Sequence, residues 1–461
     1  MEKLLVMTLV LALLFSVSPL VATANAAEEL EQGAKSELET EPELKHLSWV
    51  LHQAGTGADE DKKDENNEET EPDRIPQDKL AQDRRAQWDS LEKLSQNVEA
   101  LAQIMQPKLD DVSGFSPLSL YLALLAMRPG LSEEGQQAFD AKLNPAGLTA
   151  EELQQALALM AERSLGYDKD DQEIKIWESN TLAIGDQSLD FHPDYLAGLK
   201  ALGMGAIQGD LSSEETFQDI NALIAYYTHG LIDPLYSDGA IQEQVKKNLA
   251  NILINTLYFR DSWSREFSPE NTEDKTFYGQ SGESQVPMMQ GEKEKLSYLD
   301  TDTYTAVRKP YSSGADMLLL MPKQEVDEAT FWALYKEARN SADWESADFI
   351  LTLPKWELSS QFSLNQILED LELNNILKQD KDLRFFTQND QPLDLGSAFQ
   401  KVELKVNEEG TEAAIATVIE MELTAMPDQL SPVELVIDHP FIYAISDSGL
   451  TILQGLICDL P

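Results

Sequence analysis

The spacing of hydrophobic residues predicts helices in the first half of the folded part of the chain. In WDSLEKLSQNVEALAQIM (88–105), apolar side chains recur every three or four positions, at Leu91, Leu94, Val98, Leu101 and Met105. That spacing places them on one face of a helix. A second helix is predicted within Gly114–Met127, where Ser116 and Pro117 are typical start signals. Further helices are expected at 150–163 and 214–229.

Strand-like segments replace this pattern from about residue 250. FILTLPKWEL, QKVELKVNEEG and VELVIDHPFIYAISD are rich in β-branched and aromatic residues and are bounded by Pro, Gly and Asp. Helices therefore dominate the first half and strands the second. This order predicts an α+β fold and not a chain of alternating βαβ units.

The N-terminus resembles an export signal. Lys3 precedes an apolar run from Leu4 to about Val17, and Ala24-Asn25-Ala26 offers small residues for cleavage. The run is too short for a comfortable membrane span. We expect residues 1–26 to be a cleaved signal peptide of a secreted or periplasmic protein. The short signal and the absence of glycosylation sequons favour a bacterial source.

Residues 27–84 are predicted to be an acidic, disordered tail, because they contain many acids and few aliphatic side chains. Within the tail, Leu44–Gln53 forms a small apolar island. It is compatible with a docking helix, although a transient amphipathic turn is the preferred interpretation. A single globular domain is expected over residues 85–461.

Charge and cysteine content narrow the set of partners. The 461 residues carry a net charge of −47, which disfavours binding to nucleic acid, to anionic membranes and to heparin-type polyanions. Cys458 is the only cysteine, so the chain has no internal disulfide. Its apolar surroundings indicate a buried, inert thiol instead of a nucleophile.

The sequence lacks the common signatures of enzymes. It contains no G-x-S-x-G, no H-E-x-x-H, no G-x-x-x-x-G-K-[ST] and no G-x-G-x-x-G. Its histidines lie in the acidic tail or in turn-like contexts, except His229. A pair of catalytic carboxylates is not singled out by spacing. We therefore expect no enzymatic activity, no metal site and no cofactor.

Several separated segments together resemble the serpins. FSPLSLYLALLAM resembles the start of their helix B, and LINTLYFRDSWSREFSPENTEDKTFY with VPMM resembles their strand 3A region. KVNEEGTEAA resembles the hinge of their reactive loop, and DHPFIYAI their C-terminal strands. The resemblance covers about Trp88 to Pro461 and lies in the combination of these motifs.

The resemblance implies one domain with about nine helices and three β-sheets, including a large central sheet, and an exposed reactive-centre loop. It also implies suicide inhibition of a serine protease, which is the partner in a covalent acyl complex. The protease cleaves the loop, and the loop then inserts into the central sheet, which stalls deacylation. The protein itself is expected to be a monomer.

The hinge implied by the resemblance must leave a loop and enter a sheet. Strand alternation would turn Thr411, Ala413 and Ile415 towards the core, and Gly410 would supply backbone freedom. Ile415 is bulkier than the residue usual in inhibitory members, which favours slower insertion. The hinge residues are Glu408, Glu409, Gly410, Thr411, Glu412, Ala413, Ala414, Ile415 and Ala416.

The resemblance also assigns residues to the region where the central sheet opens. Ser116, Ser119, Asn255 and Gln400 are expected under the central sheet where its strands part. Gln400 stands where many members carry histidine, and its amide can still donate and accept hydrogen bonds. Trp263 is expected to cap the hinge, and Lys355 is expected to pair with Glu408.

The resemblance implies a scissile bond after one of three residues, because counting along the loop from Gly410 and back from Pro440 gives positions three residues apart. The candidates are Thr424, Ala425 and Met426. No Lys or Arg lies between Lys405 and the C-terminus, so a trypsin-like target is disfavoured. We expect an elastase-, subtilisin- or chymotrypsin-like target. The alternative is a non-inhibitory binding, storage or chaperone-like member whose loop is only a substrate.

Overall fold

The computed structural model describes residues 41–52, 77–106, 114–167, 173–232, 234–245, 249–363, 369, 371–373, 375–376, 382–387, 399–411 and 432–461. Within these ranges the α-helices are α3 (Gln77–Met105), α4 (Pro117–Leu125), α5 (Glu133–Leu143), α6 (Ala150–Arg163), α7 (Pro193–Ala201), α8 (Glu214–Tyr227), α9 (Asp238–Gln244) and α10 (Glu328–Asn340). Short 3-10 turns are η2 (Arg128–Gly130) and η3 (Pro269–Asn271). No helix in these ranges is long and apolar enough to cross a membrane.

The helices begin where their capping residues allow. The Ser116 hydroxyl accepts a hydrogen bond from the Ser119 backbone N–H, and proline fills the first position of α4. Helix α6 starts with a reciprocal capping box between Thr149 and Glu152. Helix α3 starts at Gln77, earlier than the domain start expected at residue 85.

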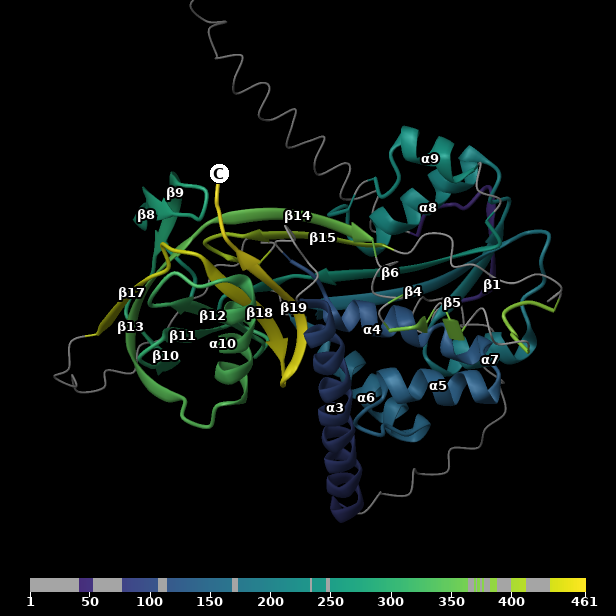
Figure 1. Ribbon diagram of the computed structural model, residues 1–461, viewed down its shortest axis with the longest axis horizontal. Helices are drawn as coiled ribbons and strands as arrows, with labels where there is room; N and C mark the ends of the chain where they lie inside the picture. Colours follow the sequence, from purple (N-terminus) through teal and green to yellow (C-terminus); the bar gives the residue numbers. More distant parts are fainter. Residues whose placement is uncertain are drawn as a thin grey trace, which may run out of the picture.

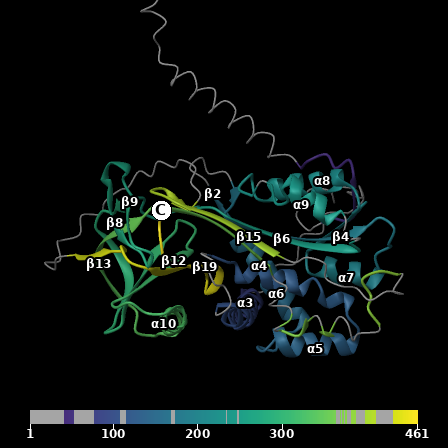
Figure 2. The same cartoon turned by 45° about the horizontal axis from the view of Figure 1, so that its top comes forward.

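Two four-stranded sheets form one layer over α4 (Figures 1 and 2). The first has the order β1 (Leu47–Leu51), β5 (Gly205–Gly209), β4 (Trp177–Asp186) and β6 (Asn251–Phe259). The second has the order β14 (Trp356–Ser363), β15 (Phe399–Val406), β16 (Gly410–Thr411) and β7 (Asp261–Ser262). Because β7 follows β6 after a single residue, the chain itself joins the two sheets at one end.

A curled nine-stranded sheet fills the other side of the molecule (Figure 1). Its order is β19 (Leu450–Ile457), β18 (Phe441–Asp447), β12 (Asp316–Pro322), β11 (Tyr304–Pro310), β10 (Glu294–Asp300), β13 (Glu345–Pro354), β9 (Glu283–Gln290) and β8 (Thr272–Tyr278), and β17 (Val433–Val436) pairs in parallel with β13. A short hairpin joins β2 (Leu165–Tyr167) and β3 (Glu173–Lys175). Strands β18 and β19 are buried throughout. The α+β fold with three large sheets is confirmed.

Strand β1 corrects the expectation for the apolar island in the tail. Leu44–Gln53 was predicted to be a helix or a transient turn, but Leu47–Leu51 adds an edge strand to β5. The Asp219 carboxylate on α8 accepts hydrogen bonds from the backbone N–H groups of Lys45 (2.9 Å) and His46 (2.6 Å). Leu47 is buried in a cluster with residues of α8 and β5. The pattern of apolar residues over these ten positions is too short to distinguish a strand from a turn. The contacts with α8 and β5 decide the conformation.

We predict that Leu47→Ala destabilises the protein by about 2 kcal/mol, because it leaves a cavity between β1 and α8. Val50→Ala is the matched control on the same strand, since Val50 is exposed and should change stability by less than about 0.5 kcal/mol. Urea unfolding followed by tryptophan fluorescence measures both. Equal midpoints for the two variants would mean that β1 does not dock in solution.

Candidate functional site

The candidate site is the line along which the two four-stranded sheets meet. Strand β6 pairs with β4 on one edge only, and β15 pairs with β14 on one edge. On their other edges, the described residues provide a partner only at the end of β15, where Val406 pairs with Thr411. Figures 1 and 2 show β6 and β15 running side by side above α4. Two such strand edges can accept another strand between them.

The first turn of α4 is fixed to β15 through Gln400. The Gln400 amide oxygen accepts from the Ser116 backbone N–H at 2.9 Å, and its amide nitrogen donates to the Ser116 carbonyl at 3.0 Å. The Ser116 hydroxyl donates to the carbonyl of Ile452 at 2.6 Å. Gln400 is buried. One amide thus satisfies both backbone groups of Ser116, as a side chain with a donor and an acceptor can.

The same turn of α4 is fixed to β6 through Ser119. Its hydroxyl donates to the side-chain oxygen of Asn255. The Asn255 amide nitrogen in turn donates to the hydroxyls of Thr181 at 2.7 Å and Ser179 at 3.2 Å. The structure therefore brings together Ser116, Ser119, Asn255 and Gln400. Two residues one turn apart on α4 hold the strands on either side of the opening.

Trp263 closes the opening at the end where β7 and β16 lie. It is completely buried, and its indole N–H donates to the carbonyl of Asn407 at 3.0 Å. Its backbone N–H donates to the carbonyl of Glu409 at 2.8 Å. The indole ring stacks on Tyr311, with ring centroids 4.4 Å apart. Trp263 thus binds the base of the hinge through both side chain and backbone, in the place expected for it.

An ion pair holds the residue that precedes this contact. Lys355 Nζ lies 2.8 Å from one carboxylate oxygen of Glu408, and the Thr272 hydroxyl donates to the other at 2.8 Å. Burial alone would raise the pKa of Glu408, but Lys355 and Thr272 together hold that pKa below its ordinary value. Their stabilisation is therefore present at neutral pH and is lost as the pH falls through the pKa of the folded state.

The hinge is partly inside the sheet already. Thr411 pairs with Val406 on β15 and with Asp261 on β7, and its side chain is fully buried. The Thr411 hydroxyl lies 2.6 Å from the hydroxyl of Tyr311. Glu409 and Gly410 donate their backbone N–H groups to the Asn407 side-chain oxygen. The remaining predicted site residues lie outside the described residues: Glu412, Ala413, Ala414, Ile415, Ala416, Thr424, Ala425 and Met426.

Gly410 is needed for space. A Cβ atom on Gly410 would lie 2.1 Å from the carbonyl oxygen of Asp261 and 2.8 Å from the Cα of Ser262. Both are backbone atoms of β7, which cannot move aside as a flexible side chain would. The backbone angle φ of Gly410 is not positive. The close approach of two strands, and not the backbone freedom predicted from sequence, therefore explains why position 410 is a glycine.

Asp261 belongs to this site but was not predicted. It is buried, and one carboxylate oxygen accepts from the Ser313 backbone N–H at 3.4 Å. Burial raises the pKa of Asp261 to about 6, since the described residues place no cation against it. The sequence offered only its position two residues before Trp263. Its destabilised charge lies on the strand that pairs with the hinge.

We predict that Gly410→Ala expels the hinge from its pairing with β7, because the added methyl group collides with the Asp261 backbone. Proteinase digestion at the hinge should become at least several-fold faster, and the urea midpoint should fall. Glu409→Ala is the control in the same turn, because its backbone contact with Trp263 is kept. Identical digestion rates for the two variants would contradict this account of Gly410.

We predict that Asp261→Asn stabilises the protein at pH 7.5 by on the order of 1–3 kcal/mol and changes little at pH 4. The folded-state pKa is raised, so the unfolded state releases its proton first as the pH rises from about 4 to about 6. Native stability falls across that window, and the amide removes this loss. Urea midpoints at both pH values measure the effect, with exposed Asp302→Asn as control. A lower midpoint at pH 7.5 would refute it.

Comparison with known proteins matches most of the chain. The family model described as "Serpin (serine protease inhibitor)" matches residues 98–459. Serpin-Z4 of barley (Hordeum vulgare) is 26% identical over 362 residues, which cover 74% of this chain and 88% of its own. Leukocyte elastase inhibitor A of mouse (Mus musculus) is 27% identical over 292 residues, covering 59% and 75%.

Solved structures agree with the fold. Serpin48 of the insect Tenebrio molitor superimposes with a TM-score of 0.67 at 17% identity, covering 80% of this chain and 99% of that one. The thermophilic serpin tengpin, in its native state, gives 0.65 at 21% identity, covering 80% and 95%. At these identities the structural similarity shows only a shared fold, whereas the family model matches most of the chain and shows the family. The chain therefore belongs to the serpin family of serine protease inhibitors.

Proposed function

We propose that this protein is a suicide inhibitor of serine proteases with elastase-, subtilisin- or chymotrypsin-like specificity. The observation that carries the proposal is the pair of strand edges on β6 and β15, with Gly410 and Thr411 positioned at one end of the opening. A strand that continues from Thr411 between these edges would complete one continuous sheet.

The chemistry begins as ordinary proteolysis. The protease serine attacks the carbonyl carbon after Thr424, Ala425 or Met426, an ester bond forms, and the peptide C–N bond breaks. The new amino terminus stays with the segment that leads to β17. The other end, esterified to the protease, is then free to move with the strand that inserts. Inhibition follows when insertion is faster than hydrolysis of the ester.

Insertion gains backbone hydrogen bonds on two edges at once and buries the inward-facing side chains. In the inserted strand, Thr411, Ala413 and Ile415 would face α4, in a space lined by the buried residues of that helix. The small side chains at 413, 414 and 416 ease passage between β6 and β15. Ile415 adds apolar area after insertion but is the bulkiest inward-facing side chain of the hinge.

Specificity follows from the composition of the loop. The candidate residues before the scissile bond are small or apolar, and no Lys or Arg follows Lys405. An S1 pocket built around a carboxylate would have no cation to bind, whereas an apolar pocket fits all three candidates. The export signal expected at 1–26 lies outside the described residues, and we propose that inhibition takes place outside the cytoplasm.

A second candidate is a non-inhibitory serpin, which Ile415 favours if it slows insertion enough for hydrolysis to win. One solved structure with this fold is thyroxine-binding globulin in complex with thyroxine, with a TM-score of 0.63 and 21% identity. The fold therefore occurs in a protein that binds a small ligand. The two candidates differ in whether the cleaved loop inserts.

The test mixes the protein with pancreatic elastase, subtilisin, chymotrypsin and trypsin. We expect SDS-stable complexes with at least one of the first three, and a large rise in the melting temperature after loop cleavage. Ala413→Arg is the matched variant: it should be cleaved equally fast but form no complex, because insertion would turn residue 413 towards the core, where a charge is excluded. A stable complex with trypsin alone would refute the target class, and an unchanged melting temperature would refute insertion.

A further inference from the structure

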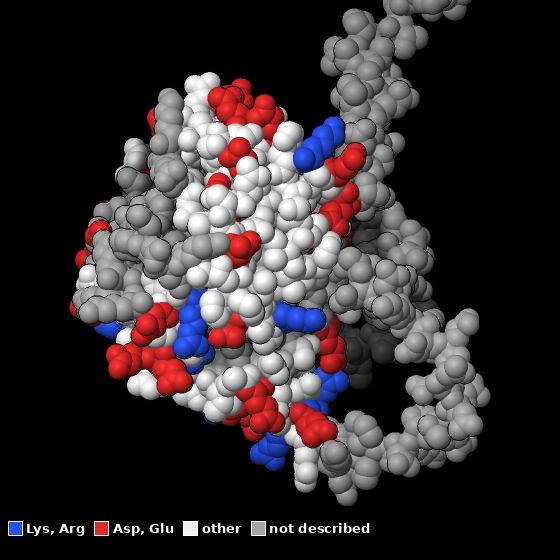
Figure 3. All heavy atoms as spheres, turned by 90° about the vertical axis from the view of Figure 1, so that its right-hand side faces the viewer, with Lys and Arg blue, Asp and Glu red and all other residues white. Residues whose placement is uncertain are grey.

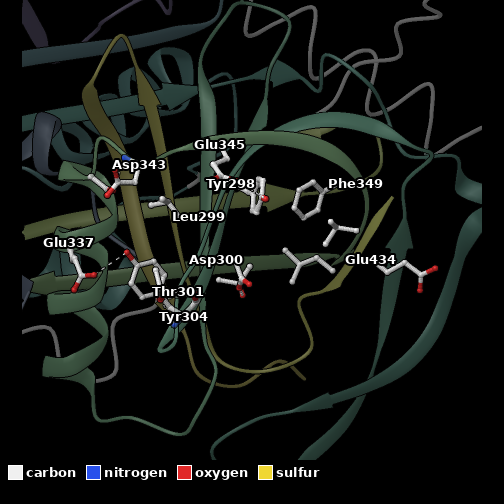
Figure 4. A pocket seen from close by; sticks show the side chains of 14 residues that line it. Tyr298, Leu299, Asp300, Thr301, Tyr304, Glu337, Asp343, Glu345, Phe349 and Glu434 are labelled. Atoms are coloured by element: carbon white, nitrogen blue, oxygen red, sulfur yellow. Dashed lines mark hydrogen bonds between the residues drawn. The ribbon is translucent and has the colours of Figure 1, made fainter. Parts of the chain in front are cut away.

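A pocket of about 740 Å³ lies beside β17, the strand that follows the reactive loop in the sequence (Figure 4). It is formed by β10, the start of β11, the C-terminal end of α10, the start of β13, and β17. Its floor is apolar and aromatic: Phe349, Tyr304 and Leu299 are buried residues of the core. At its rim, β17 pairs with β13 alone among the described strands, and Val433 is 43% exposed.

The charges around this floor have one sign. Five carboxylates line the pocket, and no Lys, Arg or His is among its lining residues: Asp300, Glu337, Asp343, Glu345 and Glu434. Asp300 is neutralised by Lys323 at 2.8 Å. Within the described part of the chain, the other four have no cationic partner. Glu345 and Glu337 accept hydrogen bonds from the hydroxyls of Tyr298 and Tyr304, at 3.1 and 3.4 Å.

This arrangement differs from the general acidity of the surface. On the face in Figure 3, which is the right-hand side of Figure 1, Lys and Arg side chains are interspersed among the acidic ones. The pocket instead combines four carboxylates that have no cationic partner among the described residues with the exposed side chain of Val433 and the half-buried ring of Tyr298. The side chains of Lys and Arg match that combination, because their stems are apolar and their heads are cationic. A guanidinium or ammonium can also lie against the Tyr298 ring.

The position of the pocket indicates which partner supplies the Lys or Arg side chain. Met426, the last candidate before the scissile bond, and Val433 are only seven positions apart, a span of at most about 25 Å. A protease that cleaves the loop there is therefore held within about that distance of β17. The residues between Thr411 and Val433 add carboxylates and no cation, so the whole approach to the loop favours a basic partner.

We propose that this pocket, with the exposed edge of β17, is a docking surface for a Lys- or Arg-bearing surface segment of the target protease. The inference rests on the proposed function, because it assigns a second contact to the same protease. Its effect is on encounter: the pocket raises the rate of association, and the loop alone determines what happens after acylation.

The test is a charge-removing triple variant, Glu337→Gln with Glu345→Gln and Glu434→Gln. Its matched control, Glu92→Gln with Glu134→Gln and Glu243→Gln, removes the same charge from exposed positions on α3, α5 and α9. The probe is leukocyte elastase, a strongly basic protease. The measured quantity is the second-order rate of loop consumption, whether it ends in a complex or in cleavage, at 0.05 and 0.5 M NaCl.

We expect the pocket variant to react about tenfold more slowly at low salt, a size typical of electrostatic steering. The two variants should converge at high salt, where the charges are screened, and the stoichiometry of inhibition should not change. Equal slowing by the control variant, or no slowing by the pocket variant, would overturn the docking surface.

A binding measurement separates this result from the proposed function. Active-site-blocked leukocyte elastase is passed over immobilised serpin, so that neither cleavage nor insertion is required. Weaker binding by the pocket variant than by the control supports the docking surface even if cleavage of the wild type yields no complex. Identical binding of both variants overturns it even if the wild type is an efficient inhibitor.

Discussion

The structure depends on two strands that lie side by side without pairing along most of their length. β6 and β15 each complete their hydrogen bonds on one edge, and α4 holds both from below through Ser119 and Ser116. Because these two serines are one turn apart on a rigid helix, the separation of the strands is fixed by the helix. Backbone groups that lack partners are costly, so filling the opening is favourable. Within the described residues, Gly410 and Thr411 fill the first positions at one end of the opening.

Control of that opening is concentrated at its hinge end, where two buried carboxylates act in opposite directions. Glu408 is stabilised by Lys355 and Thr272, and it fixes the base of the hinge to neighbouring strands. Asp261 accepts a hydrogen bond from the Ser313 backbone but has no cationic partner among the described residues, and its charge weakens the strand against which Thr411 pairs. In the proposed mechanism the hinge must hold before cleavage and release afterwards, which requires both kinds of contact. If both carboxylates were neutralised by cations, the uncleaved state would be stabilised too strongly for the proposed insertion to proceed.

Much of this could be predicted from sequence, and the exceptions have physical causes. The periodicity around Leu94 located α3 from residue 88 to 105 but not its start at Gln77, and the start signals Ser116 and Pro117 located α4. The pairing of Lys355 with Glu408, and the cluster around Gln400, came from family resemblance and not from spacing, since the partners are far apart in the chain. Strand β1 was missed because its stability comes from Asp219 on α8, which no local pattern reveals. The role of Asp261 depends on its burial in the folded protein, and that is a tertiary property.

The reactive loop is divided by its own chemistry into two parts with different constraints. In the proposed mechanism, the part from Thr411 to the scissile bond must enter the sheet, so its inward-facing residues have to be small or apolar. The part that leads to β17 would stay with the body of the molecule and would be free to carry charge. The docking surface proposed beside β17 would therefore remain in place while the acylated strand carries the protease away. Contacts there must be weak enough to break during that movement, yet able to speed the first encounter. Solvent-exposed carboxylates meet both requirements, because they act mainly on the association rate and hold little binding energy once the proteins separate.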